Sequence, residues 1–349
     1  MKEFGSDFHI VSDFDCVKNI NFPTLGGQYY SCGRQALEAL INYQRFNRIW
    51  FPEYYCHDII NYIIRRTNIR VKFYYDNPLV DDSSEIGKLI FKRGDALVRM
   101  NYFGIRGFRD EFNIDVPVIE DHSHDVLGGW ALNSNADWCI ASLRKIFPIA
   151  EGGVIWSPKR LIYPHSPILT RQNQLLAKKR WLAMKLKYDY LFDDNKSSKE
   201  KYRELFLDTE NSLDNLDLST IDEKSKDKLT HIDLSKWNQI KQDNINSIKS
   251  ILSSSTSKVS FLSKENEKCN EFSLILTFKT SQERDFVRQK LISNNVYPAI
   301  LWNVPSTMSQ KTQYFSHRTL SIACDGRYSK KDMLLLSDIL LKSICSSDD

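Results

Sequence analysis

The chain has 349 residues, of which 42% are hydrophobic and 26% charged, a composition typical of a folded globular protein. Its net charge of +4 is small and its basic residues are dispersed, which argues against nucleic acid as a partner. No apolar run approaches the roughly 18 residues that span a bilayer, so we expect no membrane partner. The seven cysteines are scattered without a CxxC pair, which favours the reducing cytoplasm and indicates neither disulfides nor a metal site.

The first 160 residues alternate short apolar segments with amphipathic helices. Hydrophobic residues at helical spacing predict helices at residues 33–46 and 56–66. Short apolar runs predict strands at residues 48–51, 71–75, 96–102, 116–120, 138–141 and 154–156. This alternation predicts an α/β fold with a mostly parallel sheet between helices. In such sheets, ligands bind beyond the carboxyl ends of the strands.

The composition changes after residue 160. Residues 161–257 are polar, charged and poor in glycine, and they predict a helical connector between a large domain at residues 1–160 and a small α+β domain at residues 258–349. One helical face of the connector carries Leu175, Leu182, Leu186 and Tyr190, and the acid-rich segment 210–228 is expected to be exposed.

The small domain shows two helix starts. Ser281 is a plausible cap for a helix that follows a strand at residues 272–279, and Ser329 with Asp332 forms a capping-box pattern. Further strands are expected at residues 296–302 and 320–324. Strands and helices in this order predict the small α+β domain.

Lys145 lies on a loop between the predicted strands 138–141 and 154–156, a loop that also contains Pro148 and the pair Gly152-Gly153. A lysine held in this way can form a Schiff base with an aldehyde when its amine is deprotonated. The simpler alternative is a solvated surface lysine, which is the usual role of a loop lysine.

Other residues supply what a pyridoxal-phosphate enzyme needs beside its lysine: an acid at the pyridine nitrogen, a phosphate site, a group at the ring hydroxyl and an aromatic over the ring. Asp121 follows an apolar strand and is the candidate acid, although a helix cap or turn is an equally simple role. Gly33 and Arg34 begin a helix, whose free N–H groups favour a phosphate, and Ser142 can add a hydroxyl.

The ring itself has candidate neighbours. Tyr55, with Tyr54 beside it, can place an aromatic ring against the cofactor, and Asn101 and His124 can reach the ring hydroxyl. Core packing is the alternative for the tyrosines, and a turn is the alternative for His124. A zinc site at His122 and His124 is weaker, because no further ligand stands at usable spacing.

The segments CGRQALEAL, FPEYYC, MNYFGIRG, VIEDHSHDVLG, SLRKIFPIAEGGV and ACDGRYSKKDM occur in one order across residues 30–340. In this order they resemble the DegT/DnrJ/StrS sugar aminotransferases, which have the aspartate-aminotransferase fold, fold type I of the pyridoxal-phosphate enzymes. The resemblance implies pyridoxal 5'-phosphate as cofactor, Lys145 as the lysine that binds it and Asp121 as its acid. His124 stands where the family usually has glutamine. Ser142 is closer to the lysine than the phosphate serine of many members.

The resemblance implies amino transfer from glutamate to a keto group of a nucleotide-linked sugar, in surface polysaccharide biosynthesis. Small molecules are then the substrates, and a homodimer is the expected assembly, with the first 30 residues and the Leu175–Tyr190 stripe as interface. Two alternatives stay open. One is another pyridoxal-phosphate activity, such as an amino-acid aminotransferase or a lyase, and the other is a binding protein that has lost catalysis. Trp302, Arg327 and Tyr328 are possible substrate contacts in the small domain.

Overall fold

A seven-stranded sheet forms the centre of the larger part of the molecule. The computed structural model describes residues 2–12, 14, 27–80, 82–109, 114–193 and 198–346. The strands of this sheet are β2 (Gln28–Tyr30), β3 (Arg48–Pro52), β4 (Arg70–Tyr74), β5 (Asp95–Met100), β6 (Val118–Asp121), β7 (Trp138–Ser142) and β8 (Gly153–Trp156), in the order β2-β8-β7-β6-β5-β3-β4. The five strands β7, β6, β5, β3 and β4 are parallel, and β8 and β2 are antiparallel additions at one edge.

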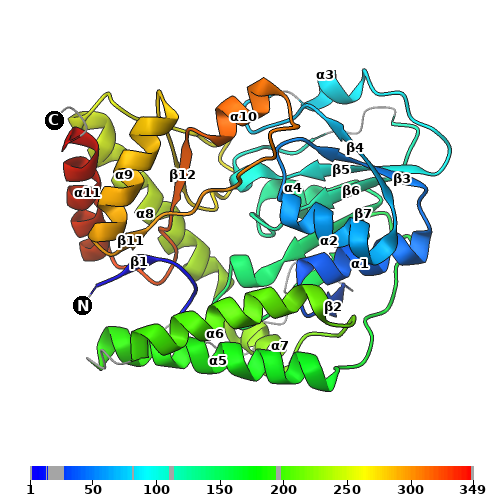
Figure 1. Ribbon diagram of the computed structural model, residues 1–349, viewed down its shortest axis with the longest axis horizontal. Helices are drawn as coiled ribbons and strands as arrows, with labels where there is room; N and C mark the ends of the chain where they lie inside the picture. The colour runs from blue at the N-terminus through cyan, green and yellow to red at the C-terminus, as the bar shows by residue number, and fades with distance from the viewer. Residues whose placement is uncertain are drawn as a thin grey trace.

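Helices cover this sheet because its strands are apolar on both faces. β5 is buried at every position, as are β6, β7 and β8, which is the pattern of strands sandwiched between layers. α1 (Gly33–Gln44) and α2 (His57–Thr67) lie against the sheet on the side that faces the viewer in Figure 1. Leu37, Leu40 and Ile63 from these helices join the core that the sheet provides. The mostly parallel α/β sheet that the sequence predicts is confirmed.

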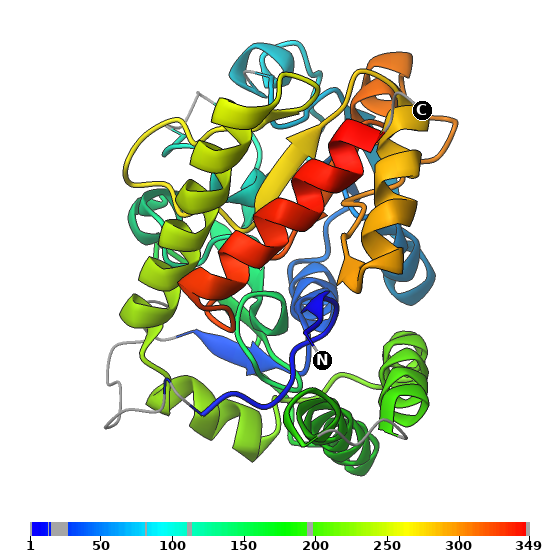
Figure 2. The ribbon, with the colours of Figure 1, turned by 90° about the vertical axis from the view of Figure 1, so that its left-hand side faces the viewer.

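The C-terminal part has its own sheet and core. β9 (Ser260–Phe261), β10 (Leu274–Thr277) and β12 (Thr319–Ile322) form an antiparallel sheet in the order β12-β10-β9. Figure 2 shows the long helices α8 (Leu234–Ser255), α9 (Ser281–Ser293) and α11 (Lys330–Cys345) packed across it. Near the chain start, β1 (Phe4–Gly5) pairs in parallel with β11 (Val296–Tyr297), so the N-terminal residues join this part. The domain boundaries at residues 160 and 257 remain a prediction, to which the pairing of β1 with β11 adds the start of the chain to the C-terminal part.

A helical pair connects the two parts. α5 (Arg171–Phe192) and α6 (Ser198–Ser212) pack side by side along the lower edge of Figure 1, and α7 (Glu223–His231) follows them. The remaining helices are short: α3 (Asp82–Ile86), α4 (Gly129–Asn133), α10 (Gln310–Ser316), η1 (Tyr102–Gly104), η2 (Leu143–Lys145) and η3 (Leu213–Asn215). In the part of the chain that the structure describes, no helix combines the length and the hydrophobicity that crossing a membrane requires.

Three local expectations need correction. Thr280, and not Ser281, caps α9, because the Thr280 hydroxyl accepts the N–H of Glu283 while the Glu283 side chain accepts the N–H of Thr280. The strand expected at residues 296–302 is confined to β11, and the chain then turns toward the large sheet. The segment 210–228 is not uniformly exposed, since Asp222 and Ser225 are buried. The capping box of Ser329 and Asp332 is confirmed.

Gly153 fixes how helix α1 meets the sheet. Gly153 lies at the start of β8, paired with Tyr30 on β2 and with Ser142 on β7. A Cβ atom built on it would lie 2.2 Å from the carbonyl carbon of Cys32 and 2.5 Å from the nitrogen of Gly33. Only glycine permits this approach, so the Gly pair seen in the sequence seats the N-terminus of α1 on the β7–β8 hairpin.

Replacing Gly153 with alanine is therefore expected to lower the free energy of unfolding by about 1–3 kcal/mol or more, because the added methyl group meets backbone that cannot move independently. Urea denaturation followed by circular dichroism measures this. Gly87→Ala is the matched control, since its Cβ would come no closer than 3.5 Å to Ser83, and it should stay within about 1 kcal/mol of wild type. Equal stability of both variants would contradict this account of the contact.

Candidate active site

Six of the eight residues predicted for the site line one narrow pocket at the carboxyl ends of β6 and β7. They are Gly33, Arg34, Tyr55, Asp121, Ser142 and Lys145. The parallel strands bring them together, because β6 ends at Asp121 and β7 ends at Ser142 on the same edge of the sheet. The position agrees with the rule that open α/β sheets bind ligands beyond these ends.

The N-terminus of α1 opens into this pocket. Cys32 is its N-cap and offers no side-chain hydrogen bond to the first turn, which leaves helix N–H groups available to an anion. A Cβ at Gly33 would lie 3.0 Å from Cβ of Ser142, so the serine stands directly beside the helix start. Gly33 and Ser142 thus lie together where the sequence placed a phosphate.

Asp121 is held by two hydrogen bonds at the bottom of the pocket. One carboxylate oxygen accepts the hydroxyl of Tyr55, and the other accepts the N–H of Ser123 at 2.8 Å. Burial, together with the neighbouring Asp121, raises the pKa of Tyr55 well above its usual value, so the hydroxyl keeps its proton and donates. Because a carboxylate has about four acceptor positions, Asp121 retains capacity for a further donor from the pocket.

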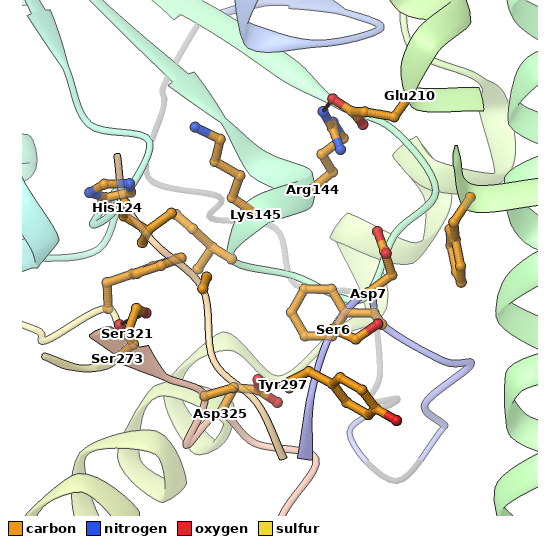
Figure 3. Close-up of a pocket in the computed structure, with 18 of the residues that line it drawn as sticks. Ser6, Asp7, His124, Arg144, Lys145, Glu210, Ser273, Tyr297, Ser321 and Asp325 are labelled. Atoms are coloured by element: carbon orange, nitrogen blue, oxygen red, sulfur yellow. Dashed lines mark hydrogen bonds and ion pairs between the residues drawn. The ribbon is translucent and has the colours of Figure 1, made fainter. Parts of the chain in front are cut away.

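Lys145 connects this narrow pocket with a larger cavity of about 460 Å³. Lys145 ends the 3₁₀ turn η2 that follows β7, and its side chain extends freely in Figure 3, with Ser273, Ser321 and Asp325 lying across the cavity. The cavity lies between the seven-stranded sheet and the C-terminal part, and it has the size of a small-molecule site. One lysine therefore faces both spaces.

His124 lies in the wall of the larger cavity as a neutral imidazole. Its Nδ1 accepts the backbone N–H of Phe103 at 3.1 Å, so the ring proton is on Nε2. The ring stacks on Phe272 at 4.6 Å and on Trp302 at 5.3 Å between centroids. Burial and the positive charge of Lys145 hold the pKa of His124 well below its usual range. His124 is therefore a hydrogen-bond donor through Nε2–H and carries no charge.

Three arginines converge on Glu210 at the other end of the cavity. Its carboxylate accepts from Arg34 at 3.0 Å, from Arg144 at 2.9 Å and from Arg180 at 3.3 Å. Burial alone would raise the pKa of Glu210, but the arginines outweigh it and bring the pKa to about 2. In Figure 3, Glu210 reaches Arg144 from the helix α6. The Nε of Arg144 is buried and has no hydrogen-bond partner among the described residues, which leaves this cluster a donor for an additional anion.

Asn101 lies outside both spaces. Its amide nitrogen is 3.2 Å from Nδ1 of His122 and 3.4 Å from the carbonyl oxygen of Asp125, and it lines neither cavity. His122 in turn contacts Glu120 at 3.1 Å, and together with Cys139 they form a buried group of the kind that can hold a metal ion. That Asn101 reaches a cofactor stays a prediction.

Several cavity residues were not predicted from the sequence. Arg180 and Glu210 come from α5 and α6, and Lys241 comes from α8. Each lies far along the chain from Lys145 and within a charged helix, where one more charged residue carries no local signal. Of the three residues named as possible substrate contacts, Trp302 and Arg327 line the cavity. The hydroxyl of Tyr328 instead accepts the N–H of Gly5.

No protein-family model and no curated protein matches this chain in sequence. Solved structures do match it in three dimensions. The PLP form of the putative sugar aminotransferase Spr1654 from Streptococcus pneumoniae superposes with a TM-score of 0.65 and 12% identity, over 96% of this chain and 93% of that one. This chain has the fold of a sugar aminotransferase. The fold type I architecture expected from the sequence is thereby confirmed.

Two further solved structures align over most of this chain. PseC of Helicobacter pylori, an aminotransferase of pseudoaminic acid biosynthesis, aligns with a TM-score of 0.62 and 13% identity, over 99% of this chain and all of that one. DesI, solved in the presence of its TDP-sugar product, aligns with a TM-score of 0.60 and 13% identity, over 92% and 81% of the two chains. At these identities, the shared feature is the fold.

His124 is expected to stay neutral between pH 5.5 and 8, because its pKa lies well below the usual value. In ¹⁵N-edited spectra of imidazole-labelled protein, its Nδ1 should resonate as an unprotonated acceptor and its Nε2 as a protonated nitrogen throughout this range. A His124→Gln spectrum identifies the resonance. A titration of this ring with a midpoint near 6.5 would contradict the buried, stacked environment described above.

Proposed function

We propose that this protein is a pyridoxal-phosphate-dependent aminotransferase. The observation that carries the proposal is a single pocket in which Lys145, Asp121 and the open N-terminus of α1 meet at the sheet edge. The similarity of fold to sugar aminotransferases supports it. A structural lysine would not need an acid and an anion site in the same pocket.

The residues present fit the cofactor at each of its functional groups. The phosphate would be held by the first N–H groups of α1, by Ser142 and by the guanidinium groups of Arg34 and Arg144. Arg144 has a donor to give, because its buried Nε has no partner among the described residues. Asp121 would hold the proton on the pyridine nitrogen. The amine of Lys145 would bind the aldehyde. Tyr55 positions Asp121 through its hydroxyl, and His124 offers Nε2–H toward the ring hydroxyl.

When bound, the cofactor would supply an electron sink for the charge that develops at the donor's α-carbon. Lys145 would be the general base that removes the proton from this carbon, and later the acid that returns a proton during transfer to the keto group. Asp121 would favour the protonated pyridine nitrogen by Coulomb attraction between its carboxylate and that positive charge. Trp302 and Phe272 stack on His124 and close one side of the cavity, which limits water around the reacting atoms.

The substrate that we propose is a nucleotide-linked keto-sugar, with glutamate as amino donor, in surface polysaccharide biosynthesis. DesI was solved with a TDP-sugar product and PseC acts in pseudoaminic acid biosynthesis, and the cavity of about 460 Å³ provides room for a sugar. Half-reactions with free amino acids and with nucleotide keto-sugars test this. Turnover of amino and keto acids alone would favour an amino-acid aminotransferase or lyase, and a protein that takes up no cofactor would favour a binding role.

Lys145→Ala is expected to abolish covalent attachment of the cofactor. Wild-type protein incubated with pyridoxal phosphate should absorb in the visible range, and borohydride should then attach the cofactor permanently to one peptide in a mass-spectrometric map. That peptide should contain Lys145. Lys159→Ala, which changes an exposed lysine paired with Asp137, is the control and should retain the adduct. An adduct on any other lysine would show that Lys145 is not the cofactor lysine.

We further propose a cytoplasmic homodimer. The stripe expected on α5 is divided: Leu175 and Leu182 are 51% and 44% exposed, whereas Tyr190 is buried against Tyr202. Phe192 and Leu207 are also exposed near this helical pair. Such apolar exposure favours a partner surface, and a two-fold dimer is the commonest closed assembly. Of the first 30 residues, 1, 13 and 15–26 lie outside the described part of the chain.

Light scattering at low micromolar concentration should therefore give twice the mass of one chain. A Leu175→Glu, Leu182→Glu double variant should shift the protein toward the monomer by about tenfold or more in dissociation constant, because charges then replace apolar contacts. Leu79→Glu is the control, because Leu79 is 69% exposed and lies outside the α5–α6 pair, shortly before α3. A wild-type monomer that turns over substrate would refute the dimer.

A further inference from the structure

Lys241 is a buried cation that the proposed chemistry does not use. It lies on α8, is 4% exposed, and lines the same cavity of about 460 Å³ as Lys145. Among the residues that the structure describes, none accepts a hydrogen bond from its ammonium group or forms a close ion pair with it. An ammonium group with three unmet donors is costly to bury, so its position in a cavity wall points to a ligand.

The carboxylates around Lys241 are engaged elsewhere. Asp325 is bound by the guanidinium group of Arg327 through two hydrogen bonds of 2.8 and 2.9 Å. Glu271 is paired with Lys249 at 2.5 Å, and Asp125 accepts from the backbone and side chain of Asn270. These groups attract Lys241 at longer range and do not satisfy its donors. Burial lowers the pKa of Lys241, while the three carboxylates oppose this effect.

The surroundings favour a carboxylate over a phosphate. The guanidinium groups that can share the charge of a phosphate gather at the opposite end, around Arg144 and Glu210. Lys241 offers one positive charge in a region that already contains three carboxylates, which suits a singly charged group better than a doubly charged phosphate. Ser273 and Ser321 also line the cavity, and their hydroxyls share a hydrogen bond of 2.7 Å. In Figure 3 this serine pair lies on the far side of the cavity from Arg144.

We propose that Lys241 binds a carboxylate of the amino-donor substrate and so selects an amino acid as donor. This inference rests on the proposed function, because it assigns the second end of the same cavity. The cavity then has two anion sites of different kinds. The arginines would bind a phosphate and Lys241 would bind a carboxylate. Lys145 lines both the narrow pocket and the larger cavity.

The test measures binding of glutarate, a dicarboxylate that lacks the amine of glutamate, to protein loaded with pyridoxal phosphate. Calorimetry should show that Lys241→Met weakens binding about 10- to 100-fold, the worth of one charge-assisted hydrogen bond, and that Lys241→Arg restores part of it. Lys236→Met is the matched control, because Lys236 lies on the same helix, is exposed and does not line the cavity. This control should bind glutarate like wild type.

Stability separates a binding role from a structural one. Lys241→Met should be at least as stable as wild type in urea, because it removes a buried charge without a hydrogen bond. A loss of stability with unchanged glutarate affinity would make Lys241 a structural counter-ion and overturn the proposal. So would equal affinity in Lys241→Met, no glutarate binding by the loaded wild type, or an effect confined to a nucleotide such as UDP.

The two proposals fail in different ways. If no borohydride adduct forms at Lys145, the proposed function is wrong, and the glutarate titration of the unloaded protein still decides whether Lys241 is a carboxylate site. If the adduct forms in wild type and in Lys241→Met alike but both bind glutarate equally, the function stands and the role of Lys241 is wrong.

Discussion

The close packing of Gly153 against the Cys32–Gly33 peptide is the constraint on which the candidate site depends. It holds the N-terminus of α1 on the β7–β8 hairpin, with Ser142 in contact with Gly33. Lys145 leaves the same hairpin three residues later. The N-terminus of α1 and the amine-bearing Lys145 are therefore set close to one another by backbone contacts, which deform less than side chains do.

Most of the charged side chains around the cavity form ion pairs, which gather at its two ends. Glu210 pairs with Arg34, Arg144 and Arg180 at one end, and Arg327 pairs with Asp325 near the other. Burying several ions is tolerable only when each is paired or hydrogen-bonded. Against this background, Lys145 and Lys241 differ from these arginines, because neither amine forms an ion pair with a carboxylate among the described residues. The helical pair α5–α6 thus does more than connect, since it brings Arg180 and Glu210 to the site.

The long-range pairing of the termini adds a second consequence. β1 joins β11, and Arg327 donates to the backbone carbonyl of Asp7 at 3.0 Å. Arg327 also lies over the ring of Phe8 at 4.3 Å. Segments from the start and the end of the chain therefore form one wall of the cavity. This wall closes the space that faces Lys145, so the site is completed only when the whole chain has folded.

The sequence by itself determined the features that depend on local periodicity and backbone chemistry. Apolar runs and helical spacing predicted the strands from β3 to β8 and the helices α1 and α2, because burial on a sheet imposes these patterns. The strand ends predicted that Asp121 and Ser142 would lie at one edge of the sheet, since parallel strands end there. That Gly33 and Lys145 would join them followed from the groups a pyridoxal-phosphate site needs and from the family resemblance. The two helix caps were predicted to within one residue. Ser329 caps α11 as predicted, and the cap of α9 is Thr280, one residue before the predicted Ser281.

Only the tertiary structure decided which charged helix residues face the cavity. Arg180, Glu210 and Lys241 lie in charged segments of α5, α6 and α8, where sequence spacing does not distinguish a solvated charge from a buried one. Their direction depends on how these helices dock against the sheet and the C-terminal part, and that docking includes contacts between residues far apart in the sequence, such as Arg34 with Glu210 and Lys187 with the carbonyl oxygen of Asp7. Asn101 shows the same limit from the other side: it directly follows β5 at the expected edge of the sheet, yet its amide contacts His122. A strand end fixes where a residue lies, and the packing around it fixes what its side chain reaches.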